Sequence, residues 1–122
     1  MQRKLSTREY DPDLIEQVLD QLQRDGLQSD ERFTELFIES RMRKGQGPVR
    51  IRLELKERGV DSSLTERALE VYEDEWRDLL RQVHDAKYGT ALVHEQKELA
   101  KRARFLEYRG FPGELIRQLL LD

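Results

Sequence analysis

The fold is decided by the stretch ELKERGVDSSLTERAL at residues 54–69, because two similar stretches occur elsewhere in the chain. They are KLSTREYDPDLIEQVL at 4–19 and FLEYRGFPGELIRQLL at 105–120, and the three align without gaps at spacings of 50 and 51 residues. Each copy has the pattern of a helix end, a tight corner after an arginine, an apolar residue and a second amphipathic helix. Repeats of about this length indicate arrays of small helical units. We therefore predict an all-α fold of tandem three-helix repeats.

Apolar residues at matched positions of the copies predict a shared core. Three leucines at one such position are expected to be equivalent and buried: Leu14, Leu64 and Leu115. Helical patterns between the copies bring the expected number of helices to seven or eight. The aromatic residues at helical or corner spacing are assigned to the core rather than to base stacking: Phe33, Phe37, Trp76, Phe105, Tyr108 and Phe111.

The repeat divides the chain into three predicted units. Residues 1–27 form the C-terminal part of a first three-helix repeat, residues 28–72 form the second repeat and residues 73–122 form the third. Only nine residues precede Tyr10, whereas each later copy has a full helix before its corner. The first repeat is therefore expected to be truncated.

Residues 49–55 alternate apolar and polar side chains, which by periodicity alone indicates a strand. We predict a helix because Pro48 suits a first helical turn and a lone strand would have no partner. On that helix Val49 with Leu53 and Ile51 with Leu55 fall on opposite sides, as in a helix packed between two neighbours.

Helix caps and turns follow from short polar motifs. Asp11 and Ser29 are expected to cap two helices, and Ser63 with Glu66 has the spacing of a capping box. A Gly-x-Gly at residues 45–47 lacks the Lys-Ser/Thr of a nucleotide-binding loop. Both glycines are instead expected to take positive φ and to turn the chain sharply before Pro48.

Composition excludes several classes of site. The chain has no cysteine, and His84 and His94 lie ten residues apart without metal-ligand spacing, so we expect surface histidines and no metal or cofactor. No constellation of nucleophile and base stands on a recognisable motif, which argues against an enzyme. The N-terminus lacks the apolar region of a signal peptide, and no run is long enough to span a bilayer. We expect a cytoplasmic monomer without membrane contact.

Charge is distributed unevenly along the chain. Residues 41–58 hold seven basic and two acidic residues, a local charge of +5, although the whole chain carries −3. The eighteen residues 61–78 hold seven acidic and two basic residues. Such an excess of basic residues is more than a solvated helix face requires and indicates a contact with acidic protein surface or with DNA phosphates.

Two segments, RMRKGQGPVRIRLELKERGV at 41–60 and FLEYRGF at 105–111, resemble the RecX family of bacterial RecA regulators. The resemblance extends from about Gln23 to the C-terminus. It implies three tandem three-helix repeats in a bent, elongated molecule. It also implies binding to RecA filaments on DNA, along the helical groove across adjacent protomers, and suppression of ATP hydrolysis, strand exchange and co-protease activity. Recombination, DNA repair and the SOS response would be modulated in this way.

The candidate partner-binding residues are the cations of two clusters. The partner expected for them is RecA or the RecA–DNA filament, with a weak direct contact to DNA left open. They are Arg41, Arg43, Lys44, Arg50 and Arg52 in the second unit, and Lys97, Lys101, Arg102 and Arg104 in the third. Arg58 and Arg109, which end helices in matched positions, are assigned to capping. The alternative function is direct DNA binding through helix-turn-helix-like units, which salt dependence would distinguish.

Overall fold

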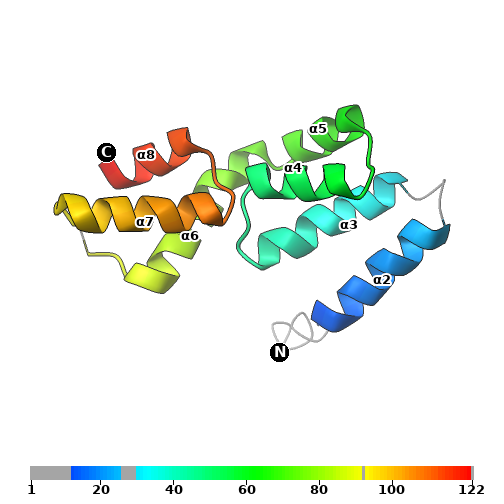
Figure 1. The fold of residues 1–122 in the computed structure, drawn as a ribbon, viewed down its shortest axis with the longest axis horizontal. Helices are drawn as coiled ribbons and strands as arrows, with labels where there is room; N and C mark the ends of the chain where they lie inside the picture. Colours follow the sequence, from blue (N-terminus) through cyan, green and yellow to red (C-terminus); the bar gives the residue numbers. More distant parts are fainter. Residues whose placement is uncertain (1–11, 26–29, 92, 122) are drawn as a thin grey trace.

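The protein is described here by a computed structural model, which places residues 12–25, 30–91 and 93–121. Within these ranges there are seven α-helices and no strand, so the predictions of an all-α fold and of the number of helices are confirmed. The helices are α2 (Pro12–Asp25), α3 (Asp30–Arg43), α4 (Pro48–Glu57), α5 (Ser62–Glu70), α6 (Trp76–Tyr88), α7 (Gln96–Tyr108) and α8 (Gly113–Leu121), with a short 3-10 helix, η2 (Glu73–Glu75), before α6. Figure 1 shows an elongated array with α2 at one end and α7 and α8 at the other.

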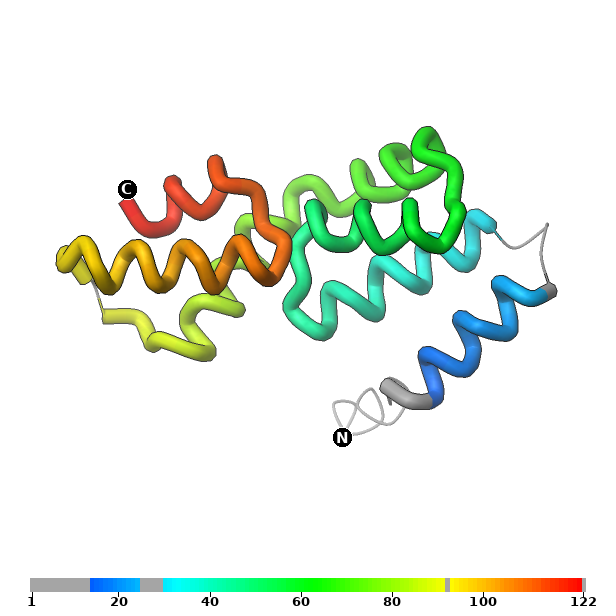
Figure 2. Tube along the Cα trace, viewed as in Figure 1, coloured from blue at the N-terminus to red at the C-terminus, as the bar shows by residue number. Residues whose placement is uncertain are grey.

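Two apolar clusters hold the array together. The first joins α2 through α5 and the start of α6, and its buried residues are Leu19, Phe33, Phe37, Ile38, Ile51, Leu55, Leu69 and Trp76. The second joins α6, α7, α8 and the corner before α8, and its buried residues are Leu80, Leu106, Phe111 and Ile116. The tube in Figure 2 shows how the chain passes once from the first group of helices to the second, through α6. Burial of these side chains is the main source of stability for helices this short.

The prediction of three equivalent buried leucines was wrong. Leu14 is 50% exposed, and Leu64 and Leu115 are half-buried. The position five residues further along the helix is buried in two copies, as Leu19 in α2 and Leu69 in α5, whereas Leu120 at that position in α8 is half-buried. Helix α2 packs against α3, so a single stripe of α2 faces the described core and Leu14 lies outside that stripe.

Helix α4 confirms the helical interpretation of the alternating segment, with Pro48 in its first turn. Its inner side, Ile51 and Leu55, is fully buried against α3 and α5. Its other side, Val49 and Leu53, is 46% and 55% exposed. The expectation of neighbours on opposite sides of α4 is therefore wrong for the described residues, because α3 and α5 both cover its Ile51 and Leu55 side.

Local details corrected three further expectations. Asp61, not Ser63, caps α5, because its carboxylate accepts hydrogen bonds from the backbone N–H groups of Ser63 and Leu64. Gly45 has the expected positive φ of 80°, but Gly47 has φ −90°. The aromatic residues are buried or half-buried except Tyr108, which is 75% exposed. The predicted caps Asp11 and Ser29 lie outside the described residues.

Candidate partner-binding surface

The turn at residues 44–47 links α3 to α4 and forms the centre of the basic segment. Gly45 donates to the Met42 carbonyl and Gln46 donates to the Arg41 carbonyl, which closes the end of α3 in a tight turn. The positive φ of Gly45 makes this turn possible. Arg43 and Lys44 thus stand where α3 ends, and Arg50 and Arg52 stand in the first turns of α4.

This turn is joined to the corner between α7 and α8. Gly47 N donates to the Arg109 carbonyl at 2.8 Å, and Val49 N donates to the Gly110 carbonyl at 2.9 Å. A Cβ at Gly47 would lie 2.5 Å from the Gly110 carbonyl oxygen, so glycine is needed there for close approach rather than for its φ. The two groups of helices are thus connected through backbone hydrogen bonds as well as through side chains.

The repeated arginines do more than cap helices. Arg58, at the end of α4, contacts α2: its Nη1 donates to the Gln23 side chain, and ion pairs at 3.7 Å link it to Glu16 and Asp20. Arg109, at the end of α7, donates from Nη1 to the Lys44 carbonyl at 2.7 Å. Each arginine therefore ties its own helix to the preceding unit. The matched Arg8 lies outside the described residues.

Arg41 has an internal role. Its side chain is 10% exposed, and its guanidinium pairs with Glu16 of α2 and Glu54 of α4 and stacks 4.2 Å from the centre of the Phe37 ring. Burial by itself would raise the pKa of Glu16, but the hydrogen bond from Arg41 and the nearby cations, including Lys44, hold the pKa below its usual value. Arg41 therefore links three helices and has little surface left for a partner.

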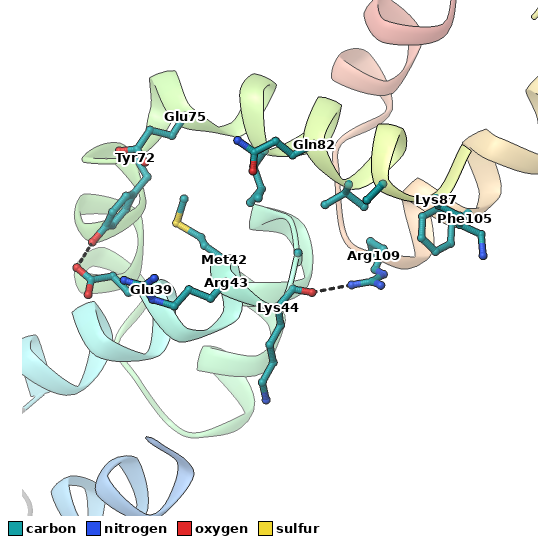
Figure 3. A pocket seen from close by; sticks show the side chains of 14 residues that line it. Glu39, Met42, Arg43, Lys44, Tyr72, Glu75, Gln82, Lys87, Phe105 and Arg109 are labelled. Atoms are coloured by element: carbon teal, nitrogen blue, oxygen red, sulfur yellow. Dashed lines mark hydrogen bonds between the residues drawn. The ribbon is translucent and has the colours of Figure 1, made fainter. Parts of the chain in front are cut away.

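Arg43 and Lys44 line a large hollow of about 1230 Å³ between the end of α3 and the helices α6 and α7. Figure 3 shows Tyr72 and Glu39 at one end of this hollow and Arg109 and Lys87 at the other, with Lys44 between them. Its apolar lining comes from Met42, Leu79, Val83, Ala86 and Phe105. The hollow is thus acidic at one end, basic at the other and apolar in part between them.

The Tyr72 hydroxyl lies at the Glu39 end of this hollow and loses its proton less readily than an ordinary tyrosine. The Tyr72 hydroxyl donates to Glu39 Oε2 at 3.0 Å. Burial, this hydrogen bond and the negative charges of Glu39, Glu35 and Glu75 raise the pKa of Tyr72 to about 12. The hydroxyl therefore stays protonated to a more alkaline pH than that of an ordinary tyrosine, and its hydrogen bond links the start of η2 to α3.

Arg50 and Arg52 line a different, smaller hollow of about 550 Å³ together with Lys56 and Tyr108. Arg50 pairs with Glu54 at 3.3 Å, and Arg52 pairs with Glu66 at 2.6 Å. The predicted basic cluster is therefore divided. Arg43 and Lys44 border the large hollow, and Arg50 and Arg52 border the small one.

The basic cluster of the third unit is also divided by burial. Arg102 is buried: its Nε donates to Glu98 at 3.0 Å, and its Nη1 lies 3.2 Å from His84 Nε2. His84 itself is buried, with Nδ1 2.9 Å from Asp85, so the expectation of two surface histidines was wrong for His84. The remaining cations of the cluster are exposed on α7: Lys97, Lys101 and Arg104.

Two cations at the hollows were missed by the sequence pattern. Lys87 ends α6 and lies 4.7 Å from the centre of the Phe105 ring at the large hollow. Nothing in the sequence marked it, since its basic neighbours come from other elements. Lys56, in the small hollow, was part of the charge excess but was not singled out. Within the described ranges, no group of three or more His, Asp and Glu residues could hold a metal ion, and no helix is long and apolar enough to cross a bilayer.

Comparison with known proteins places these helices in a family. The family model described as RecX, second three-helix domain, matches residues 29–69, and the one described as RecX, third three-helix domain, matches residues 73–120. The chain belongs to the RecX family. The matched ranges cover α3 to α5 and η2 to α8, while the boundaries predicted at residues 27 and 72 stay predictions.

Comparisons with individual proteins agree with this RecX assignment. A protein named regulatory protein RecX from Pseudomonas syringae pv. tomato is 42% identical over 118 residues, which cover 97% of this chain and 76% of the relative. Its namesake from Halorhodospira halophila is 37% identical over 115 residues, which cover 94% of this chain and 71% of the relative. The resemblance seen in the sequence is therefore confirmed, and with it a regulatory role of the RecX type.

Proposed function

We propose that this RecX-family chain binds RecA filaments on DNA and restrains their ATP hydrolysis, strand exchange and co-protease activity. Recombination, DNA repair and the SOS response in the cytoplasm would be modulated through that contact. Family membership supports a regulatory role, and the relatives carry the name regulatory protein RecX. On this proposal the protein acts as a monomer through binding and has no turnover of its own.

The observation that carries this proposal is a set of cations around the junction of the two helix groups, all of them exposed except Arg50, which is half-buried. Arg43 and Lys44 border one hollow, and Arg50, Arg52 and Lys56 border the other. An exposed ion pair contributes only about 0 to 1 kcal/mol, so an acidic filament surface would have to meet several cations at once. The elongated array offers these contacts over a length that spans two helix groups (Figure 1).

The test is a titration of RecA's DNA-dependent ATPase with the protein, run beside binding to RecA-coated and to bare single-stranded DNA. We expect the ATPase rate to fall with dose and the protein to bind the coated DNA preferentially. An unchanged ATPase rate at saturating dose would contradict the proposal.

Salt distinguishes direct DNA binding from filament binding. Binding to phosphates alone weakens by orders of magnitude between low and physiological salt. If the protein bound bare and coated DNA equally, with that steep salt dependence, it would be a DNA-binding protein that affects RecA by competition. Docking on the filament's protein surface predicts a shallower dependence and a requirement for RecA.

A further inference from the structure

Three large apolar side chains meet at the small hollow instead of being buried. Val49 and Leu53, one turn apart on α4, line it together with Tyr108 from the last turn of α7. Most of the Tyr108 side chain and about half of each of the other two remain exposed. Single exposed apolar residues are ordinary on protein surfaces, but three that converge on one concavity from two helices mark a binding surface.

The repeat supplies an internal control for this feature. Helix α7 of the third unit matches α4 at an offset of 51 residues, and there Ala100 stands for Val49 and Arg104 stands for Leu53. Both are exposed in the structure. The three-helix unit therefore folds with a small or a charged residue at these positions. The apolar stripe of α4 is consequently not required by the fold.

The rim of the hollow determines the charge of its partner. Arg50, Arg52 and Lys56 face a single acidic lining residue, Glu107. The two arginines are already paired within the chain, whereas Lys56 forms no ion pair with any described residue. An apolar floor with a basic rim matches a helix or loop that presents an apolar side chain between carboxylates.

We propose that the hollow formed by Val49, Leu53 and Tyr108 is an apolar anchoring site for a projecting side chain on the protein surface of the RecA filament. The proposal rests on the function proposed above and adds that binding to the filament is not purely electrostatic. The anchoring side chain enters between α4 and the end of α7, and the carboxylates beside it meet Lys56. Because apolar contacts in a desolvated centre carry most of the energy of such interfaces, this hollow determines affinity while the outer cations determine the rate of encounter.

The experiment transfers the third unit's own residues into the second. The double variant Val49→Ala/Leu53→Arg is expected to fold normally and to bind RecA-coated DNA roughly tenfold or more weakly than the parent. Because the lost contact is apolar, the weakening should persist at high salt, where the attraction of the added arginine for carboxylates is screened. If the hollow bound its partner by charge alone, the added arginine would instead strengthen binding, which would overturn the proposal.

Two more variants test whether the effect is specific to the hollow. Tyr108→Glu alters the opposite wall with the residue that α4 carries at the matched position, Glu57, and should also weaken binding. Val71→Ala truncates an apolar side chain that is 74% exposed away from the hollow and should change nothing. Thermal unfolding of each variant excludes a folding defect.

The remaining outcomes separate the two proposals. A parent protein that fails to bind RecA-coated DNA contradicts the proposed function. A parent that binds, with hollow variants that bind equally well, overturns the anchoring site alone. Sedimentation of the parent without RecA tests a second copy as the occupant. Self-association that the double variant abolishes would assign the hollow to that copy and overturn the assignment to the filament.

Discussion

Arg41 differs from its basic neighbours because its guanidinium has partners on three sides. A guanidinium offers five donors in one plane and is weakly hydrated, so it can bridge two carboxylates and stack on a ring at the same time. At residue 41 it bridges Glu16 and Glu54 over the Phe37 ring. Arg43, two residues further along α3, is exposed. Two arginines of one helical turn thus have different roles.

Replacing Arg41 by alanine should lower the free energy of unfolding by about 2 kcal/mol, because two partly buried carboxylates, Glu16 and Glu54, each lose their closest cation. Their partial exposure keeps the loss below that of a fully buried pair. Arg43→Ala is the matched control and should shift stability by no more than about 0.5 kcal/mol. Chemical denaturation measures both, and equal effects of the two changes would refute the internal role of Arg41.

At the scale of elements, the corner between α7 and α8 fits closely against the start of α4. Gly110 has φ 96°, and a Cβ there would lie 2.3 Å from Arg50 Cβ and 2.8 Å from Arg50 N. Gly59, at the matched corner after α4, has φ 84°, and a Cβ there would meet nothing within 4 Å. The two glycines therefore share a backbone conformation but differ in their surroundings.

This pair separates backbone strain from steric contact. Gly59→Ala should lower the free energy of unfolding by about 1 kcal/mol, which is the cost of a positive φ for alanine. Gly110→Ala adds a clash with the α4 backbone and should lower it by about 3 kcal/mol. Thermal or urea unfolding gives the comparison. If the two variants were equally stable, the corner would not be a close contact.

At the scale of the whole molecule, binding by exposed cations has to be collective. Arg43, Lys44 and Arg50 lie on both sides of the junction, and each alone contributes little. The buried cations Arg41 and Arg102 stabilise the two helix groups instead. An extended partner surface would therefore meet a line of separate weak contacts, with the hollow of Val49, Leu53 and Tyr108 between them.

Reversal of Arg43, Lys44 and Arg50 to glutamate adds repulsion at three sites and should weaken inhibition of the RecA ATPase several-fold to about a hundredfold. Single alanine changes at these positions should be mild. The changes at Arg43 and Lys44 should affect the unfolding temperature little, because exposed substitutions shift stability by about 0.5 kcal/mol each. Reversal of Arg50, which is half-buried and paired with Glu54, should lower it somewhat more, because it places two carboxylates one helical turn apart. A folded triple variant that inhibits as well as the parent would move the electrostatic contact to the exposed cations of α7: Lys97, Lys101 and Arg104.

The helices and their repetition could be predicted from residue spacing along the chain. Amphipathic spacing and turn residues act over a few neighbours, so the α4 helix could be predicted from Pro48 and the repeat despite its alternating pattern. The family resemblance depended on the same local motifs and was confirmed. The N-cap residue of α5 could not be predicted in this way, because Asp61 and Ser63 are both favourable N-cap residues and the choice between them depends on backbone geometry.

The tertiary structure alone decided which cations and apolar residues are available to a partner. Burial of Arg41 requires Glu16 and Glu54 from two other helices, and burial of Arg102 requires His84 from α6. Exposure of Val49 and Leu53 depends on the absence of a second covering element among the described residues. Such contacts join residues far apart in the chain, and local periodicity carries no information about them.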